Sequence, residues 1–414
     1  MPESKKDHKF VKGTLCGVLL MCVIFVGLVV TDVVHFAGAQ RLTEITEDIG
    51  TDGQQEIVID NAVETKLELI QKLAEKYFLY DVDEEALKEG LYSGYVDALD
   101  DIYTTYYDEE ETKELMESTT GVYSGVGAVL TQQTDTKLIQ VLSVYKDSPA
   151  EEAGLKEDDV IYSVDGREIE DEELSEIVGW IKGEEGSQVV LGVYRERGVG
   201  NEELELTATR RKIEAQTVEY EMKENQTGYL RITEFDSVTQ DQFANALDAL
   251  EQQGMERLII DLRSNPGGNL DTVCEMLRMI LPEGMIVYTE DKDGKRDTEY
   301  FNEEDHTFEK PLVVLVNGMS ASASEIFAGA VQDYGVGKIV GTTTYGKGVV
   351  QRLVDLQDGT CLKLTIAQYF TAKGRNIHGK GIEPDITVEF EVNEQDEDAD
   401  NQLEKAMEIV GENP

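Results

Sequence analysis

Residues 317–351 constrain the fold and the chemistry of this chain more than any other part of its sequence. An apolar run, Val313–Val316, comes before them, and a cluster of small residues opens them. Apolar residues then recur at one-face spacing within Glu325–Val331, which predicts a buried strand, a tight turn and a helix. A serine in that turn and a glycine-flanked lysine, Lys347, are the groups that a Ser-Lys hydrolase needs.

Ser322 is the candidate nucleophile. Ser320 and Ser324 lie two residues away on each side, so the local sequence alone does not choose among the three. Ser322 and Glu325 fit the Ser-x-x-Glu capping-box pattern, which places Ser322 at a helix N-terminus. Unpaired N–H groups and the helix dipole favour an oxyanion there. The same pattern also fits a serine that only caps a helix, and this alternative stays open.

Lys347 is the candidate general base. Glycines flank it on both sides, and the neighbouring residues are mainly apolar, so its segment can approach other backbone closely and lose water. Loss of water disfavours the ammonium form and lowers the pKa of a lysine from about 10.4 toward neutrality, as a general base requires. Gln351, four residues on, can orient the amine by accepting a hydrogen bond from it. A surface lysine on a glycine turn is the competing interpretation.

The segment Gly341–Lys347 also satisfies Gly-x-x-x-x-Gly-Lys, the beginning of a phosphate-binding P-loop. Position 348 is glycine, whereas magnesium binding needs serine or threonine there. Residues 349–356 predict a strand, but a P-loop must be followed by a helix. We therefore predict no nucleotide site.

The segment Asp261–Gly268 follows a predicted strand and ends in two adjacent glycines, Gly267 and Gly268. Backbone without side chains can aim its N–H groups at a developing oxyanion. Taken alone, Pro-Gly-Gly is also an ordinary turn, so this segment gains meaning only beside the serine and the lysine.

Charge and cysteine content exclude several functions. The formal net charge of −48 is spread along the chain, and such a surface repels nucleic acid, so we expect no nucleic-acid partner. The cysteines show no CxxC spacing, so we expect no metal site. Cys274 and Cys361 lie in apolar surroundings and are expected to be buried thiols.

Residues 15–30 form an almost unbroken apolar run with lysines before it. Positive charge ahead of such a run predicts a cytoplasmic N-terminus and an exported remainder. The run is slightly short of a comfortable span of about 20 residues, and it extends through Ala37 at the cost of including Asp32. Cleavage of a signal peptide after Ala39 is the alternative. We favour a single-pass membrane anchor, and both interpretations export the rest of the chain.

The residues after this run divide into segments that differ in the spacing of their apolar residues. Residues 41–118 carry apolar residues at helical spacing, interrupted by an aromatic and β-branched cluster at 100–107. From Gly121 short apolar runs predict strands at 126–130, 139–144, 160–164 and 189–193. Residues 148–155 predict a short helix with a serine cap, a proline at its first position and a glycine stop. A second helix is expected over Glu172–Lys182.

This order of elements resembles a PDZ domain over about 90 residues, carried by Ser148-Pro-Ala, Ala-Gly-Leu155, Asp-Val-Ile161 and Val-Asp-Gly166. The resemblance implies that the Gly125-Val126-Gly127 turn presents backbone N–H groups to the C-terminal carboxylate of a peptide. The physical basis is strand addition combined with carboxylate capture. A plain tight turn is the alternative for these glycines.

A larger α/β unit is expected from residue 213 to residue 392. Apolar strands are predicted at 228–232, 257–262, 312–316, 338–340 and 361–370, with helices at 240–252, 270–281 and 324–333 between them. Alternating strands and helices are typical of an α/β core. An acidic tail with a short helix, 402–410, ends the chain.

Together these segments resemble the C-terminal processing peptidases, serine proteases of the S41 type. The residues that carry the resemblance are Asp261–Gly268, Ser320–Glu325, Gln332-Asp333, Tyr345–Gly348 with Gln351, and Gly374–Asp385. Ile102 and Ala372 replace prolines that the family usually has, and neither belongs to the catalytic set. The match extends from about Asp97 to Val388 in the family's order of domains.

The resemblance assigns roles residue by residue. Ser322 is the nucleophile, Lys347 the general base and Gln351 the residue that positions the lysine. The N–H of Ala323 and one N–H of the Gly267-Gly268 pair form the oxyanion hole. The core is expected to be crotonase-like, and no metal or cofactor takes part. Members recognise C-terminal tails through the PDZ domain, and Lys182 lies near a position where some relatives carry an arginine that couples peptide binding to activation.

The sequence therefore predicts an α/β multidomain protein made of an N-terminal anchor (1–40), a helical module (41–118), a PDZ domain (119–212), a protease core (213–392) and an acidic tail (393–414). The expected function is that of an exported serine endopeptidase that binds protein C-termini and dimerises through its N-terminal helices. A catalytically silent PDZ adaptor is the main alternative. A Ser-His arrangement is a third, with only His306 and His378 in the core segment.

Overall fold

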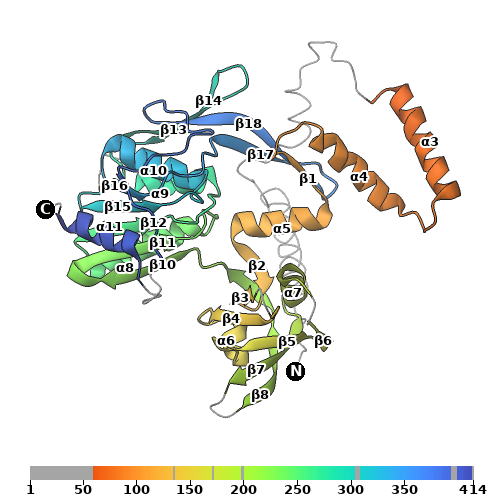
Figure 1. The fold of residues 1–414 in the computed structure, drawn as a ribbon, viewed down its shortest axis with the longest axis horizontal. Coiled ribbons are helices and arrows are strands. Elements are labelled where there is room, and N and C mark those ends of the chain that lie inside the picture. The colour runs from red at the N-terminus through yellow and green to blue at the C-terminus, as the bar shows by residue number, and fades with distance from the viewer. Residues whose placement is uncertain are drawn as a thin grey trace, which may run out of the picture. The chain divides into compact units, whose positions relative to one another are not determined.

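The computed structural model describes residues 59–133, 136–169, 172–196, 200–303, 308–392 and 399–412 (Figure 1). The chain divides into two compact units, Met1–Asp108 with Arg352–Leu364, and Glu109–Gln351 with Thr365–Pro414. The apolar run at 15–30, expected to be an anchor or a signal peptide, lies outside the described residues. Within the described part, no helix is both long and apolar enough to span a bilayer.

The described part of the first unit contains two helices and a small sheet. Its elements are α3 (Asn61–Tyr77), α4 (Glu84–Asp97) and β1 (Thr105–Tyr107), which pairs antiparallel with the beginning of β18 (Cys361–Thr371). Asp60 and Asp83 cap the two helices by accepting hydrogen bonds from N–H groups of the first turn. The predicted helices are confirmed, and so is the break at the aromatic cluster. No residue of α3 or α4 is buried.

The second unit begins with α5 (Glu109–Thr120), which the sequence places in the helical module, and continues with the PDZ segment. The elements of this segment are β2 (Val122–Gly125), β3 (Ala128–Gln132), β4 (Ile139–Val144), α6 (Pro149–Ala153), β5 (Val160–Val164), β6 (Arg167–Glu168), α7 (Leu174–Ile181), β7 (Gln188–Glu196), β8 (Asn201–Thr209) and β9 (Arg211–Glu214).

The PDZ segment is mostly β with two helices, as predicted. Its main sheet has the order β3-β4-β5-β7-β8, with β6 on β5, and β2 pairs separately with β9. Helix α6 begins after the Ser148 cap and ends at Gly154, whose φ of 87° is left-handed. Fully buried side chains from the sheet and α7, such as Ile139, Ile161 and Ile177, form a core of its own.

The core of the second unit is a mixed α/β assembly. Its elements are β10 (Val218–Lys223), β11 (Thr227–Ile232), α8 (Thr239–Gln252), β12 (Arg257–Asp261), α9 (Leu270–Arg278), β13 (Gly284–Glu290), β14 (Arg296–Asn302), β15 (Leu312–Val316), α10 (Ala323–Tyr334), β16 (Lys338–Gly341), the beginning of β17 (Val349–Asp355), the end of β18, β19 (Ile386–Thr387) and α11 (Asn401–Glu412).

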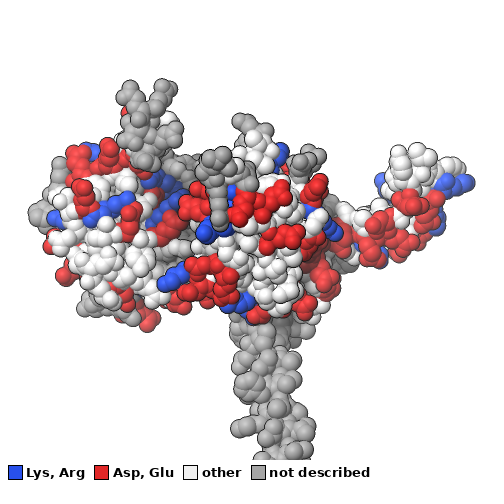
Figure 2. Space-filling model, turned by 90° about the horizontal axis from the view of Figure 1, so that it is seen from below, with Lys and Arg blue, Asp and Glu red and all other residues white. Residues whose placement is uncertain are grey.

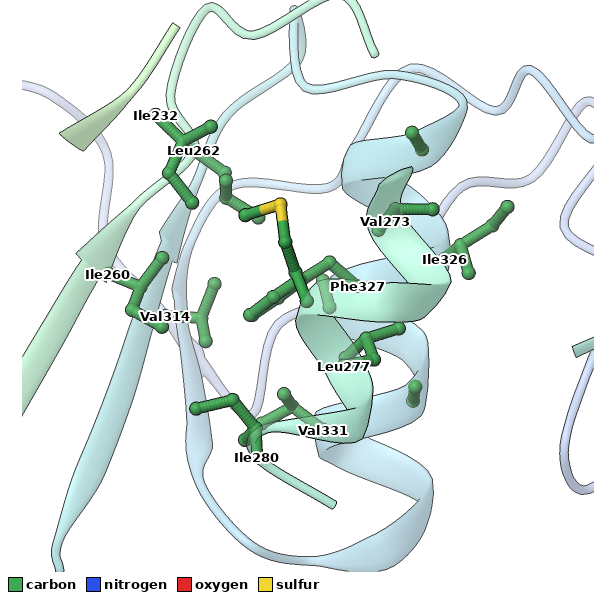
Figure 3. Packing of buried hydrophobic residues seen from close by; sticks show 14 of the residues in the cluster. Ile232, Ile260, Leu262, Val273, Leu277, Ile280, Val314, Ile326, Phe327 and Val331 are labelled. Carbon is green, nitrogen blue, oxygen red and sulfur yellow. The ribbon is translucent and has the colours of Figure 1, made fainter. Parts of the chain in front are cut away.

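A six-stranded sheet runs β10-β11-β12-β15-β16-β19 and is parallel from β11 onward. Successive residues of β12 point to opposite faces, so Leu258 and Ile260 pack with α8, α9 and α10, whereas Ile259 packs with α11. Figure 3 shows Phe327 of α10 among side chains of α9 and the sheet. Burial on both faces explains why these strands read as continuous apolar runs.

A second sheet runs β1-β18-β13-β14, and β17 pairs with β18. The carboxyl ends of β12 and β15, neighbours in the parallel sheet, lead into residues 262–269 and 317–322. The loops that carry the predicted oxyanion glycines and the predicted nucleophile therefore leave the same edge of the sheet. Figure 2 shows acidic side chains spread over the face drawn there, with basic side chains among them.

Candidate active site

Ser322 lies in the connection from β15 to α10 and is the N-cap of that helix. Its φ of 54° and ψ of −114° are unusual for a residue with a side chain, and the residue is partly exposed. Such a conformation costs about 1–3 kcal/mol and persists only where the surroundings hold it; it is concentrated at functional sites. The predicted strand-to-helix turn and helix start are confirmed.

The structure separates the three serines of this turn. Ser320 and Ser324 are fully buried, and their hydroxyls donate to the carbonyls of Leu262 (2.8 Å) and Asn265 (3.0 Å). Both flanking serines thus join the nucleophile turn to the segment that carries Gly267 and Gly268. Ser322 is the member of the three that is not buried.

Glu325 brings the serine and lysine segments together. Its carboxylate is fully buried, and Oε2 accepts from the N–H groups of Ser322 and Lys347, at 2.8 Å each. Oε1 accepts from the Gly346 N–H (2.7 Å) and the Thr344 hydroxyl (2.6 Å). The sequence predicted only a capping role for Glu325, and no local pattern signals its bonds to residues 344–347.

The glycines beside Lys347 permit the close approach that the sequence predicted. A Cβ on Gly348 would lie 2.5 Å from the His378 nitrogen, and Gly346, with φ of 91°, accepts from the Gly379 N–H at 2.8 Å. Lys347 itself is partly buried. Strand β17 begins at Val349, so no helix follows the lysine and the P-loop alternative fails.

Gln351 is partly buried on β17, four residues beyond Lys347. Its Nε2 donates to the Thr365 hydroxyl of β18 at 3.3 Å. This bond fixes the orientation of the amide, and the predicted contact of Gln351 with the lysine amine stays a prediction.

The glycine pair lies beside the nucleophile. A Cβ on Gly267 (φ 106°) would lie 2.8 Å from Ser322 Cβ and 3.0 Å from the Ala323 nitrogen. The Gly267 N–H donates to Asn265 Oδ1 at 2.8 Å. Among the residues that the structure describes, no acceptor faces the N–H groups of Gly268 and Ala323. Of the two glycines, Gly268 is therefore the better candidate for the oxyanion hole, together with Ala323.

The predicted peptide site is a groove beside β3. A cavity of about 120 Å³ is lined by Tyr123, Gly125, Val126, Gly127, Ala128, Leu130, Leu155, Ile161, Val178, Ile181, Lys182 and Leu191. Strand β3 forms the edge of its sheet there. The N–H groups of Val126 and Gly127 have no acceptor within the described ranges. At the end of α7, Lys182 pairs with Glu117 of α5 at 3.0 Å and lies over the Tyr123 ring.

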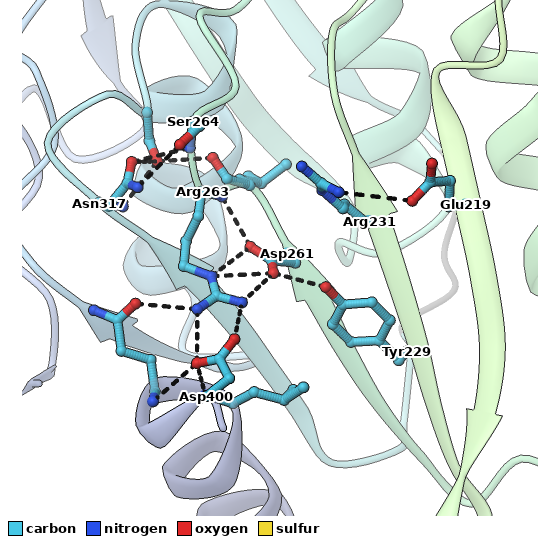
Figure 4. Close-up of polar contacts among 12 residues, drawn as sticks. Glu219, Tyr229, Arg231, Asp261, Arg263, Ser264, Asn317 and Asp400 are labelled. Carbon is cyan, nitrogen blue, oxygen red and sulfur yellow. Dashed lines mark hydrogen bonds and ion pairs between the residues drawn. The ribbon is translucent and has the colours of Figure 1, made fainter. Parts of the chain in front are cut away.

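A second hollow, of about 590 Å³, opens at the carboxyl end of the parallel sheet. Figure 4 shows polar contacts among side chains at this end of the sheet. There the Arg263 guanidinium donates to the carboxylate of Asp261 and to that of Asp400, and the Tyr229 hydroxyl donates to Asp261 at 2.8 Å. Burial by itself would raise the pKa of Asp400, but the hydrogen bonds and positive charge of the Arg263 guanidinium hold this pKa below its usual value. Because the guanidinium is saturated by protein groups, this cluster attaches α11 to β12 and is not an anion site.

The possible metal ligands of the described ranges are histidine, cysteine and acidic side chains. No group of histidine, cysteine, aspartate and glutamate in the described part of the chain could hold a metal ion. Cys274 and Cys361 are buried free thiols, as expected. Burial raises the pKa of the Cys274 thiol far above its usual range, so it is unreactive. His378 is exposed, and His306 lies outside the described residues.

Comparison with known proteins shows which families this chain resembles. Residues 226–388 match the model of peptidase family S41, and residues 140–195 match a PDZ domain. A probable CtpA-like serine protease of Staphylococcus aureus is 36% identical over 334 residues, which cover 80% of this chain and 66% of the relative. The carboxy-terminal processing protease CtpA of Bacillus subtilis is 37% identical over 309 residues, covering 74% of this chain and 65% of the relative.

Solved structures also resemble this chain. The photosystem II D1 C-terminal processing protease is 31% identical, with a TM-score of 0.45 and coverage of 77% of this chain and 86% of that one. An S41 protease from Bacteroides fragilis, 18% identical, has a TM-score of 0.51 and covers 87% and 99%, which supports the fold alone. The chain spans just under two thirds of the length of the two curated relatives.

Proposed function

Because this chain belongs to peptidase family S41 and contains a PDZ domain, we propose that it is a serine endopeptidase that selects substrates by their C-terminal tails. Ser322 and Lys347 form the catalytic pair. The observation that carries the proposal is the buried Glu325 carboxylate, which binds the N–H groups of both residues and so places their segments side by side.

The reaction follows from these positions. The amine of Lys347 takes the proton of the Ser322 hydroxyl as the oxygen attacks the scissile carbonyl. The N–H groups of Gly268 and Ala323 stabilise the oxyanion. The lysine then gives its proton to the leaving amine, which leaves an acyl ester on Ser322. A water molecule, deprotonated by Lys347, hydrolyses the ester and restores the free serine, with Gln351 holding the lysine in place.

Tail recognition uses the groove beside β3. The N–H groups of Val126 and Gly127, which have no acceptor in the part of the chain that the structure describes, suit a terminal carboxylate, and the edge of β3 suits an added peptide strand. An arriving carboxylate would compete with Glu117 for Lys182. Since Glu117 lies on α5, and the Thr119 carbonyl at the end of α5 accepts from the Asn269 side chain at 3.0 Å, this competition offers a route for gating.

The N-terminal helices support a dimer as a further part of the proposal. Several large apolar side chains on α3 and α4 are exposed, namely Leu69, Ile70, Leu73, Tyr77, Leu87, Leu91, Tyr92 and Tyr95. An exposed apolar surface of this kind marks an interaction site. We propose that a second copy covers it and that residues 1–40 anchor the protein, or direct its export, so that the catalytic domain acts outside the cytoplasm.

The test compares the purified ectodomain with its Ser322→Ala and Lys347→Ala variants on casein and on a substrate with a free apolar C-terminus. Loss of cleavage in both variants, with unchanged thermal unfolding, is the expected result. Full activity of Ser322→Ala would overturn the assignment. A wild type that binds tails and cleaves nothing would support the silent PDZ adaptor, and loss of activity in His378→Ala or His306→Ala would support a Ser-His arrangement.

A further inference from the structure

Tyr369, like Glu325, is hydrogen-bonded to the backbone of both proposed catalytic residues. It lies near the end of β18 and is 1% exposed, and its hydroxyl is 3.1 Å from the Ser322 carbonyl and 2.5 Å from the Lys347 carbonyl. One hydroxyl proton is thus shared between two carbonyls that are 25 positions apart in the sequence. Only the oxygen of Tyr369, not its ring, makes this link.

The buried side chains of Glu325 and Tyr369 bind different backbone groups of the proposed catalytic pair. Glu325 accepts from the N–H groups of Ser322 and Lys347, whereas Tyr369 donates to their carbonyls. Each residue thus has its N–H bound by Glu325 and its carbonyl bound by Tyr369. The Ser322 carbonyl also accepts from the N–H groups of Glu325 and Ile326 in the first turn of α10. Because the backbone of each residue is fixed in this way, the direction of its Cα–Cβ bond is fixed as well.

The local backbone needs such restraint. Ser322 has a φ of 54°, a conformation that reverts unless neighbours hold it. Lys347 lies between Gly346 and Gly348, and glycine permits a wide range of backbone angles. Without a bond to its carbonyl, the lysine segment would lose one of the contacts that fix its backbone beside the Ser322 turn.

We propose that Tyr369 is a positioning residue, whose hydroxyl holds the Ser322 and Lys347 backbones in register for proton transfer. The inference rests on the proposed Ser322-Lys347 mechanism. Tyr369 touches no substrate in this scheme. Its effect is confined to the chemical step, because a displacement of about 1 Å between reacting groups can cost roughly 100-fold in rate.

The test is Tyr369→Phe, which keeps the ring in the core and removes the hydroxyl. Tyr334→Phe is the matched control, because the Tyr334 hydroxyl donates at 2.8 Å to the carbonyl of Met285, a bond between a tyrosine and backbone that touches neither catalytic residue. We expect Tyr369→Phe to lower kcat about 10- to 100-fold with KM unchanged. Labelling of Ser322 by a fluorophosphonate should slow in the same ratio. Tyr334→Phe should leave both rates within about twofold.

A double-mutant cycle guards against a merely structural effect. In the Lys347→Ala background, Tyr369→Phe should add little further loss of the residual rate, because the pair that it positions is already broken. A full additional loss there, or a kcat equal to that of Tyr334→Phe, would overturn the inference. Ser322→Ala is measured alongside: if that variant stays active, the proposed mechanism itself fails, whereas an inactive Ser322→Ala with an unaffected Tyr369→Phe removes only the inference.

Discussion

The proposed catalytic loops and the PDZ groove differ in how their polar groups are paired. In the catalytic loops, buried hydroxyl and carboxyl groups such as those of Ser320, Ser324 and Glu325 bond to the backbone of neighbouring segments, and within the described residues the N–H groups of Gly268 and Ala323 stay without an acceptor. In the groove, the lining is mainly apolar, the N–H groups of Val126 and Gly127 are unpaired within the described residues, and β3 offers an open edge.

The two regions differ in which groups supply the hydrogen-bond partners of their backbone. Catalysis requires groups that are already in position when the substrate arrives, so the protein itself supplies their hydrogen-bond partners. In the tail site that we propose, a bound peptide would supply these partners instead. If this comparison is right, substitutions in the two regions should separate kcat from KM.

The largest effect is expected for Ser322→Ala. Loss of the nucleophile should lower kcat by at least about 1,000-fold, because residual catalysis then depends on the oxyanion hole and binding alone. Affinity for a tail peptide, measured by fluorescence anisotropy, should stay unchanged. A variant that loses tail affinity together with activity would contradict the separation of the two regions.

Glu325→Gln should impair both the rate and the stability. The amide keeps one acceptor oxygen but presents an NH2 group to backbone N–H donors, so buried donors lose their partner at a cost of about 1–3 kcal/mol. We expect kcat to fall about 100-fold, with a lower free energy of unfolding in urea. Glu404→Gln, in the first turn of α11, is the control, and it should leave kcat unchanged.

Val178→Asp should affect substrate binding instead. Val178 lies on α7 and lines the groove, so a carboxylate there repels a C-terminal tail and opposes apolar contact. We expect KM for a tailed protein to rise about tenfold, equivalent to 1.4 kcal/mol, with kcat for a short untailed peptide unchanged. Ser175→Asp, exposed on the same helix, is the control. Equal effects of the two substitutions would argue against the groove as the tail site.

The smallest effect concerns the junction between the two regions. Gly121, which follows α5, packs against Asp236, and burial, aided by Glu234, raises the pKa of Asp236 to about 7. Because this pKa lies above the unfolded value of about 3.9, folding loses stability as the pH rises through that interval. Asp236→Asn should therefore stabilise the protein above about pH 7.

Urea unfolding at several pH values measures this effect. The stability gained by Asp236→Asn should shrink as the pH falls toward about 4, where the wild-type carboxyl is protonated in both states. A gain that does not depend on pH would show that the carboxyl does not titrate in this interval. Tail affinity and kcat should change little, since neither catalytic residue nor the groove is altered.

The spacing of apolar residues in the sequence predicted those helices and strands whose buried residues follow the same spacing. The strands at 139–144, 160–164 and 312–316 and the helix beginning after Ser322 agree with prediction because their apolar patterns match their burial. Strands β8, β13 and β14 were missed. Strands β8 and β14 pair antiparallel and carry many polar residues, such as Glu203 and Glu205 of β8, so no apolar run marks them. Strand β13 was missed although it contains the short, mostly buried apolar run 285–288.

By itself, the sequence determined the residue types of the site, namely a serine at a helix start, a glycine-flanked lysine and a glycine pair, because these depend on local spacing. Only the tertiary structure decided which of the three serines is partly exposed and which glycine N–H donates to Asn265. The tertiary structure alone also brings Glu325 and Tyr369 into contact with the backbones of both Ser322 and Lys347. These bonds join residues that are far apart in the chain, and no local pattern encodes a contact that folding alone creates.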